Sequence, residues 1–215
     1  MSCCIFAQPG KAPESIQYIS DYLSMRVVNE IPLSGSFIDF RENGLHFTKD
    51  STNLSNFLHV DFLSGPMGWR LKRTEHETSL KKAIGKNKED ITIFDGTAGL
   101  LSDTIIFLAL GHKVIACEQS KIIFLLVNDA IERAKTELPF LENLVLLNGK
   151  SETQYKETQN IDIVYLDPMY PEPSKKVLRS GDISTINHIL QIENIDDGGD
   201  AIFLVSKTAT LKKLF

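Results

Sequence analysis

From residue 91 onward, short β-rich runs alternate with longer helical runs, and this alternation constrains the fold more than any other feature of the chain. Strands are expected over 91–94, 113–117, 143–147, 161–166 and 201–206, and helices over 100–110, 121–138 and 183–192. Strands that alternate with helices of about 10–15 residues favour a parallel sheet covered on both faces. Because crossovers between parallel strands are right-handed, the pattern predicts an α/β domain with a doubly wound, Rossmann-like sheet.

The region before residue 66 has a different texture, in which turn residues interrupt short apolar runs. In the segment 37–47, Asn43 and Gly44 separate two such runs, and because both residues tolerate positive φ we predict a hairpin there. The segment 57–63 is expected to form another strand. We therefore predict a small β-rich N-terminal lobe over 1–65, a connecting segment over 66–90 and a Rossmann-like domain over 91–215.

The connecting segment is the most basic part of the chain, and we expect a helix over 75–84 that ends at Gly85. Acidic residues are interspersed with its lysines and arginines, so charge alone favours a solvated linker. Trp69 offers a ring for base stacking, but packing against the sheet is the expectation.

Composition excludes several classes of protein. Of the 215 residues 42% are apolar and 24% charged, which is typical of a globular protein. The 23 basic and 28 acidic side chains give a net charge of −5, which argues against coating nucleic acid through bulk charge. The three cysteines and five histidines lack metal-site spacing, so we expect no metal. The odd number of cysteines, with no paired framework, fits a reducing compartment. With no secretory signal and no apolar run long enough to span a bilayer, a cytoplasmic protein is expected.

Acidic and glycine residues follow the first two predicted strands of the sheet. The segment DGTAGLLSD (95–103) begins with Asp95, and its Gly96 and Gly99 allow a sharp turn and a close approach to a ligand. It is neither the G-x-G-x-x-G of dinucleotide enzymes nor a phosphate loop. Glu118, 23 positions after Asp95, ends the second strand and is placed to bind ribose hydroxyls. Together these features fit S-adenosylmethionine (SAM) better than NAD.

The segment LDPMYP (166–171) is the most specific feature of the chain. Its two prolines fix φ and remove backbone donors, so that Asp167 and the carbonyl groups remain available as acceptors. Tyr170 offers a face for stacking a base, worth ~1–3 kcal/mol in comparable sites. We therefore predict that Asp167, Pro168 and Tyr170 form the catalytic group.

The segments DGTAGLLSD, ACEQS and YLDPMYP resemble the three main motifs of class I SAM-dependent methyltransferases. More closely, the chain resembles the bacterial ribosomal small-subunit methyltransferase J family, which methylates the exocyclic N2 of a guanine in 16S ribosomal RNA. FIDF and HVDFLSGPMGWRLKR look like that family's entry segment, and VYLDPMYP is similar to its VYLDPMFP. The resemblance covers roughly residues 36–207.

This resemblance implies SAM as cofactor and small-subunit ribosomal RNA as partner, with the oligomeric state left open. With the residues identified above, the predicted cofactor contacts are Asp95, Gly96, Gly99, Ser102, Asp103, Glu118, Gln119, Lys150, Ser151 and Asp167. The basic stretch 70–88 is a candidate RNA track because of its location around the proposed site. The predicted RNA contacts are Arg70, Lys72, Arg73, Lys175 and Lys176.

The chain also departs from the family pattern. Leu101 and Ser102 stand where the family has Gly-Arg, Gln119 stands where it has Arg, and Lys150 where it has Ser. Class I methyltransferases continue beyond the fifth strand with a helix and an antiparallel hairpin, and that hairpin is expected to be missing here. Two alternatives stay open. One is an adenine N6 methyltransferase, because D-P-P-Y-like loops also serve that amine. The other, which these departures favour, is a non-catalytic relative that binds RNA or the ribosome.

Overall fold

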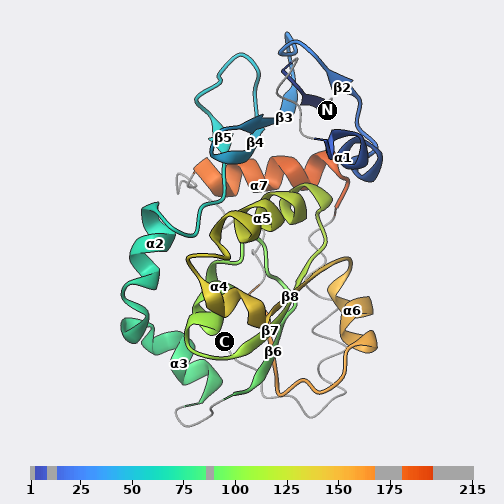
Figure 1. Cartoon of the computed structure of the whole chain (residues 1–215). Coiled ribbons are helices and arrows are strands. Elements are labelled where there is room, and N and C mark those ends of the chain that lie inside the picture. Colours follow the sequence, from blue (N-terminus) through green and yellow to red (C-terminus); the bar gives the residue numbers. More distant parts are fainter. Residues whose placement is uncertain (1–2, 9–13, 86–89, 168–180, 196–215) are drawn as a thin grey trace, which may run out of the picture. The chain divides into compact units, whose positions relative to one another are not determined.

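The structure, a computed structural model, describes residues 3–8, 14–85, 90–167 and 181–195 (Figure 1). Contacts divide the chain into two compact units. The first consists of Met1–Val60, Ser120–Ala130 and Ser174–Asp196, and the second of Asp61–Gln119, Ile131–Pro173 and Asp197–Phe215. The domain boundaries at residues 65 and 90 remain a prediction along the sequence.

The first unit contains a five-stranded mixed sheet with the strand order β2-β1-β3-β4-β5. Its strands are β1 (Cys3–Phe6), β2 (Val27–Val28), β3 (Ser36–Arg41), β4 (Gly44–Thr48) and β5 (Phe57–Leu58). β1 pairs in parallel with β2 and β3, whereas β3, β4 and β5 pair antiparallel. The unit's helices are α1 (Ile16–Leu23), α7 (Gly181–Ile192) and the first part of α5 (Lys121–Ala134).

The predicted hairpin is confirmed, but its turn lies one residue earlier than the Asn-Gly pair. Arg41 pairs with Gly44, so Glu42 and Asn43 form the turn, and of the Asn-Gly pair only Gly44 takes a positive φ, of 117°. The strand expected over 57–63 is shorter, since β5 ends at Leu58, and within the rest of that segment the Asp61 carboxylate accepts the backbone N–H of Leu63 at 2.8 Å. Such a local side-chain turn competes with ladder pairing.

The second unit contains a four-stranded sheet with the order β8-β7-β6-β9, in which every neighbouring pair is parallel. Its strands are β6 (Thr92–Asp95), β7 (Lys113–Glu118), β8 (Leu144–Asn148) and β9 (Ile163–Tyr165). Its helices are α2 (Gly65–Leu71), α3 (Thr78–Ile84), α4 (Ser102–Ala109), α6 (Ser151–Glu157), the end of α5, and the short 3₁₀ segments η1 (Thr74–His76) and η2 (Pro139–Asn143). The α/β prediction is confirmed, and the strand expected over 201–206 lies outside the described residues.

Two predicted helices differ from the observed ones for local reasons. The helix expected over 75–84 is interrupted at Glu77, whose backbone is not helical (φ −72°, ψ 58°), so η1 and α3 are separate. The helix expected over 121–138 ends at Ala134. The residue before a proline is disfavoured in the helical region, and Leu138, before Pro139, has φ −123° and ψ 76°.

The core of the second unit holds the parallel sheet in place. Phe94, Cys117 and Val164, from three neighbouring strands, form a buried cluster. α4 is buried over most of its circumference, since five of its residues, from Thr104 to Leu108, are no more than 1% exposed. The chain order reverses at β6, which lies between β7 and β9. In doubly wound sheets ligands bind at the carboxyl edge beside such a switch point.

Candidate active site

Four polar side chains follow the carboxyl ends of the four parallel strands. Asp95 ends β6, Glu118 ends β7, Asn148 ends β8, and Asp167 lies two residues after β9. Parallel strands present their carboxyl ends at one edge of the sheet, so these side chains belong to the same edge. The sequence predicted three of them, and Asn148 was missed.

The loop over 96–101 is tied to both strands that neighbour β6. The Gly96 N–H donates to the carbonyl of Tyr165 over 3.1 Å, and the Ala98 N–H donates to the carbonyl of Cys117 over 3.3 Å. Gly99 and Leu101 both take positive φ, of 50° and 62°. A leucine is strained there by about 1–2 kcal/mol. Its side chain is fully buried, at 0% exposed, and this burial offsets the strain.

Asp95 is buried beneath this loop, at 2% exposed. Its carboxylate accepts the Thr104 hydroxyl at 2.5 Å and the Thr97 N–H at 3.1 Å. Burial raises the pKa of Asp95 to about 6, and the charges of Asp103 and Asp167 act in the same direction. Asp95 therefore holds the loop in place through the Thr97 N–H and adds negative potential to this edge of the sheet.

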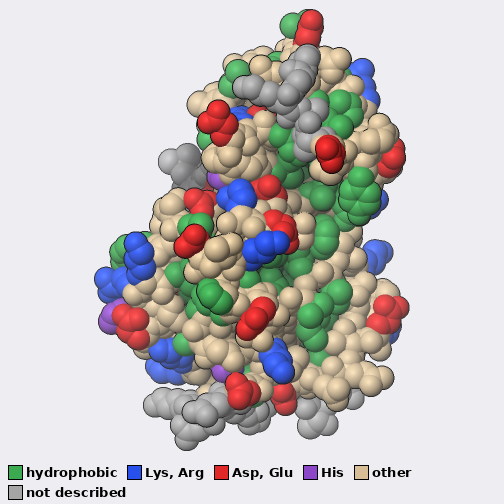
Figure 2. Space-filling model, in the orientation of Figure 1, with side chains coloured by type: hydrophobic (Ala, Val, Ile, Leu, Met, Phe, Trp, Pro, Cys, Tyr) green, Lys and Arg blue, Asp and Glu red, His purple; other side chains and the backbone are tan. Residues whose placement is uncertain are grey.

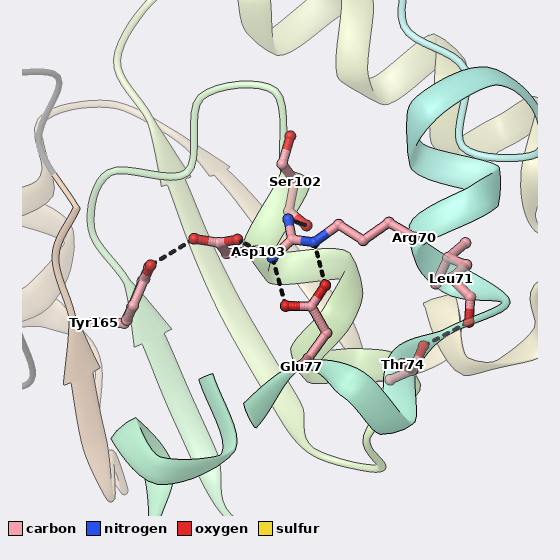
Figure 3. Close-up of polar contacts among 7 residues, drawn as sticks. All are labelled: Arg70, Leu71, Thr74, Glu77, Ser102, Asp103 and Tyr165. Atoms are coloured by element: carbon pink, nitrogen blue, oxygen red, sulfur yellow. Dashed lines mark hydrogen bonds and ion pairs between the residues drawn. The ribbon is translucent and has the colours of Figure 1, made fainter. Parts of the chain in front are cut away.

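Asp103, in the first turn of α4, joins two distant elements (Figure 3). Its Oδ1 accepts the Arg70 guanidinium from α2 at 2.7 Å, and its Oδ2 accepts the Tyr165 hydroxyl from β9 at 2.5 Å. Burial and the bond to Asp103 raise the pKa of Tyr165, so the phenol stays a neutral donor. Sequence reasoning did not assign Tyr165, although it directly precedes the segment LDPMYP (166–171).

On the β7–β8 side of the edge, backbone and amide groups make most of the contacts. The Asn148 side chain donates to the carbonyls of Glu118 and Gln119, at 2.8 and 3.3 Å. Glu118 is 8% exposed, whereas Gln119 is exposed. Lys150 is the exposed N-cap of α6, and the hydroxyl of Ser151 donates to the carbonyl of Gly96.

Asp167, two residues after β9, is exposed. Its backbone N–H donates to the Thr97 hydroxyl over 2.7 Å, which ties it to the loop after β6. Partial desolvation raises the pKa of Asp167 above its usual value, and the charge of Asp103 raises it further. The other predicted catalytic residues, Pro168 and Tyr170, lie outside the described residues, as do Lys175 and Lys176.

The predicted RNA contacts on α2 and after it differ in exposure. Lys72 and Arg73 are exposed, and the Arg73 guanidinium lies 4.7 Å from the ring centre of Trp69. The expectation that Trp69 packs against the sheet is wrong, because α2 buries Gly68 instead and leaves the indole 62% exposed. The side chain of Arg70 is 26% exposed and binds Glu77 and Asp103.

Two absences concern only the part of the chain that the structure describes. Among these residues no group of three or more His, Cys, Asp or Glu side chains could hold a metal ion. No helix among them combines the length and the apolarity that crossing a bilayer requires.

The chain is similar to proteins from several bacteria that share one name. A protein named ribosomal RNA small subunit methyltransferase J from Desulfotalea psychrophila is 32% identical over 156 residues, which cover 69% of this chain and 59% of that protein. Its namesake from Shewanella denitrificans is 31% identical over 185 residues, covering 82% of this chain and 75% of that protein. The namesake from Pectobacterium atrosepticum is 27% identical, covering 100% of this chain and 87% of that protein.

The fold and the family follow from two further matches. The crystal structure of a SAM-dependent methyltransferase from Neisseria gonorrhoeae has a TM-score of 0.67 at 24% identity, covering 99% of this chain and 82% of that chain, and it supports the predicted fold. A family model described as putative SAM-dependent methyltransferase matches residues 24–209. The chain therefore belongs to the SAM-dependent methyltransferase family, with S-adenosylmethionine as its cofactor, and within that family to the group named ribosomal RNA small subunit methyltransferase J.

Proposed function

We propose that this chain transfers the methyl group of SAM to the exocyclic N2 of a guanine in 16S RNA of the small ribosomal subunit. The name of its relatives supports ribosomal RNA as the substrate. The observation that carries the proposal is the position of Asp167, an exposed acceptor held beside the loop after β6 by its bond to Thr97. The assignment of the methyl acceptor as the N2 atom of a guanine rests on the sequence resemblance.

The groups at the carboxyl edge fit this cofactor chemically. The ribose of SAM needs acceptors for two hydroxyls, and Glu118 at the end of β7 supplies a carboxylate. The sulfonium and ammonium charges favour an acidic surrounding, which Asp95, Asp103 and Asp167 provide. Gly96 and Gly99 allow close approach of the backbone, and Ser102, Gln119, Lys150 and Ser151 complete the proposed set of contacts.

Bound SAM supplies an electrophilic methyl group, so the protein needs no nucleophile of its own. The task of the chain is to orient the acceptor amine. In this proposal Asp167 accepts one N–H of the amine, raises the electron density on its nitrogen and takes up the proton that the nitrogen loses as it is methylated. The Pro168 carbonyl accepts the second N–H and Tyr170 stacks on the base. A guanine in folded RNA must first leave its stack, at a cost of a few kcal/mol.

RNA binding is proposed to depend on a local surface around α2. Figure 2 shows acidic and basic side chains intermixed on the visible face, in agreement with the net charge of −5. Lys72 and Arg73 offer exposed cations for phosphates, and the exposed ring of Trp69 offers a stacking face. Because such contacts release counterions, RNA affinity should fall steeply with salt concentration.

The first test is calorimetric binding of SAM to the complete chain, followed by transfer of a radiolabelled methyl group to small ribosomal subunits that lack the modification. Micromolar SAM binding, which corresponds to about −8 kcal/mol, is expected. Digestion of the product RNA should yield N2-methylguanosine. N6-methyladenosine would replace the proposal by the adenine alternative. A folded chain that binds RNA but not SAM would leave the non-catalytic alternative.

A further inference from the structure

Arg70 makes four side-chain contacts with groups near the proposed cofactor loop (Figure 3). Its Nε and Nη2 donate to the two Glu77 oxygens, at 2.6 and 3.1 Å. Nη2 also donates to Asp103 at 2.7 Å, and Nη1 donates to the carbonyl of Ser102 at 3.0 Å. All three guanidinium nitrogens therefore donate to groups of the second unit. Ser102 and Asp103 lie 32 and 33 positions later in the chain, on α4, and Glu77 lies 7 positions later.

Asp103 connects Arg70 with β9. It accepts Arg70 with one oxygen and the Tyr165 hydroxyl with the other. The Tyr165 ring also packs edge-on against Phe107, with ring centres 4.9 Å apart and planes at 77°. Asp103 and Phe107 lie one turn apart on α4, so Tyr165 is held along one face of that helix at two points.

We propose that Arg70 is a positioning residue for the methyl-transfer site. It fixes the first turn of α4 through Ser102 and Asp103, and through Asp103 it fixes Tyr165 at the end of β9. The distance between the loop after β6 and Asp167 then depends on a residue of α2. This inference rests on the proposed function only in taking that edge of the sheet as the site of cofactor binding and transfer.

The charge of Arg70 has a second consequence at the same place. Asp103 faces Arg70 and Glu77 on one side and Tyr165 on the other, and its charge acts on Asp95 and Asp167. Arg70 is the cation bonded to this acidic group among the described residues. Without it, the charge of Asp103 is no longer balanced, and protonation of Asp167 becomes easier. The pKa of Asp167 should then rise further.

The test compares Arg70→Met and Tyr165→Phe with the unchanged chain, using calorimetric SAM affinity and thermal unfolding. Arg70→Met should weaken SAM binding by about tenfold or more, and Tyr165→Phe by about threefold to tenfold. Because both act through Asp103, the double variant should lose less than the product of the two effects. Lys135→Met removes a positive charge just after α5 and should leave the SAM affinity unchanged.

A pH profile separates positioning from simple loss of structure. In Arg70→Met, the acid side of the profile of methyl transfer should move to higher pH, because Asp167 must be ionised to accept the amine. Arg70→Lys keeps the positive charge but loses the several N–H donors of the guanidinium. It should therefore restore the pH profile of methyl transfer more fully than the SAM affinity. If Arg70→Met does not fold, Tyr165→Phe decides the matter, since it keeps the ring on Phe107 and removes only the hydroxyl.

Two outcomes would overturn the inference. One is SAM affinity and a pH profile in folded variants that match the unchanged chain. The other is a loss of RNA affinity in Arg70→Met with SAM affinity unchanged, which would restore the interpretation of Arg70 as an RNA contact. Failure of the proposed function would give a different result, because the unchanged chain would bind SAM without methylating ribosomal RNA. The SAM affinities of the variants would still test the positioning role of Arg70.

Discussion

The two halves of the carboxyl edge are built from different chemistry. Beside β6 and β9, the carboxylates of Asp95 and Asp103 accept hydroxyls and one guanidinium, and Asp167 is tied by its backbone N–H to the Thr97 hydroxyl. Beside β7 and β8, the contacts are mostly neutral: the Asn148 amide binds two carbonyls, and the Gly149 N–H donates to the carbonyl of Glu118 over 3.0 Å.

This difference predicts different sensitivities. Carboxylates that lie near one another depend strongly on protonation and on their counter-charge, and here the charge of Asp103 raises the pKa of both Asp95 and Asp167. Neutral hydrogen bonds contribute about 0.5–1.5 kcal/mol each and respond little to pH. The β6–β9 half should therefore control catalysis and pH dependence, and the β7–β8 half should contribute mainly affinity.

The largest expected effect is at Asp167. Asp167→Ala should lower methyl transfer by about a thousandfold, or ~4 kcal/mol, because the amine loses its acceptor. The fold should be kept, since the bond to Thr97 uses the backbone N–H of residue 167. Radiolabel transfer measures the rate of methylation and a thermal melt measures whether the fold is kept. Asp21→Ala, which changes an exposed residue on α1, is the control. Transfer at the unchanged rate would remove Asp167 from the mechanism.

The pH dependence of stability should separate the halves next. Burial raises the pKa of Asp95 in the folded state to about 6, from 3.8 in the unfolded state. The protonated side chain therefore stabilises the folded state below pH 3.8, and this contribution is lost as the pH rises toward 6. The contribution of Asp95 should thus fall by up to ~3 kcal/mol between about pH 4 and pH 6. Denaturant unfolding of Asp95→Asn should lack this decline. Parallel pH curves for the two proteins would contradict the assignment.

A change at Gly68 tests whether α2 is needed for the β6–β9 half. A Cβ at this position would lie 2.5 Å from the carbonyl oxygen of Leu63. Gly68→Ala should therefore destabilise the protein by ~2 kcal/mol and displace Arg70 with its helix. Thermal unfolding and SAM calorimetry should both respond. A stability loss without any loss of SAM affinity would separate α2 from the site.

The smallest effect is expected in the β7–β8 half. Glu118→Gln keeps the shape of the side chain and removes its charge, so SAM affinity should fall by about tenfold, or ~1.4 kcal/mol. The acid side of the pH profile should not move. Glu157→Gln, an exposed change at the end of α6, is the matched control for charge. A larger effect here than at Asp167 would reverse the comparison of the two halves.

Much of the frame of the site could be predicted from local sequence. The alternation of strands and helices gave the parallel sheet, and the acids after β6, β7 and β9 were identified because a strand end is marked by its neighbours in sequence. The hairpin was identified from its turn residues, although the positive φ falls on Gly44 alone. These signals depend on backbone preferences and side-chain periodicity over a few residues.

The supports of the site were not predictable in this way. Arg70 and Glu77 lie in a segment whose mixed charges favour a solvated linker, and only the packing of α2 near α4 brings Arg70 to Asp103. The burial of Asp95 and the left-handed backbone of Leu101 also depend on what surrounds them.

The sequence by itself therefore determined the α/β order of the domain and the acids at the ends of three strands. The tertiary structure alone decided which charges pair and which are buried. The physical reason is that strand and helix signals are local, whereas the free energy of a charge depends on its distance to other charges and on its exposure to water.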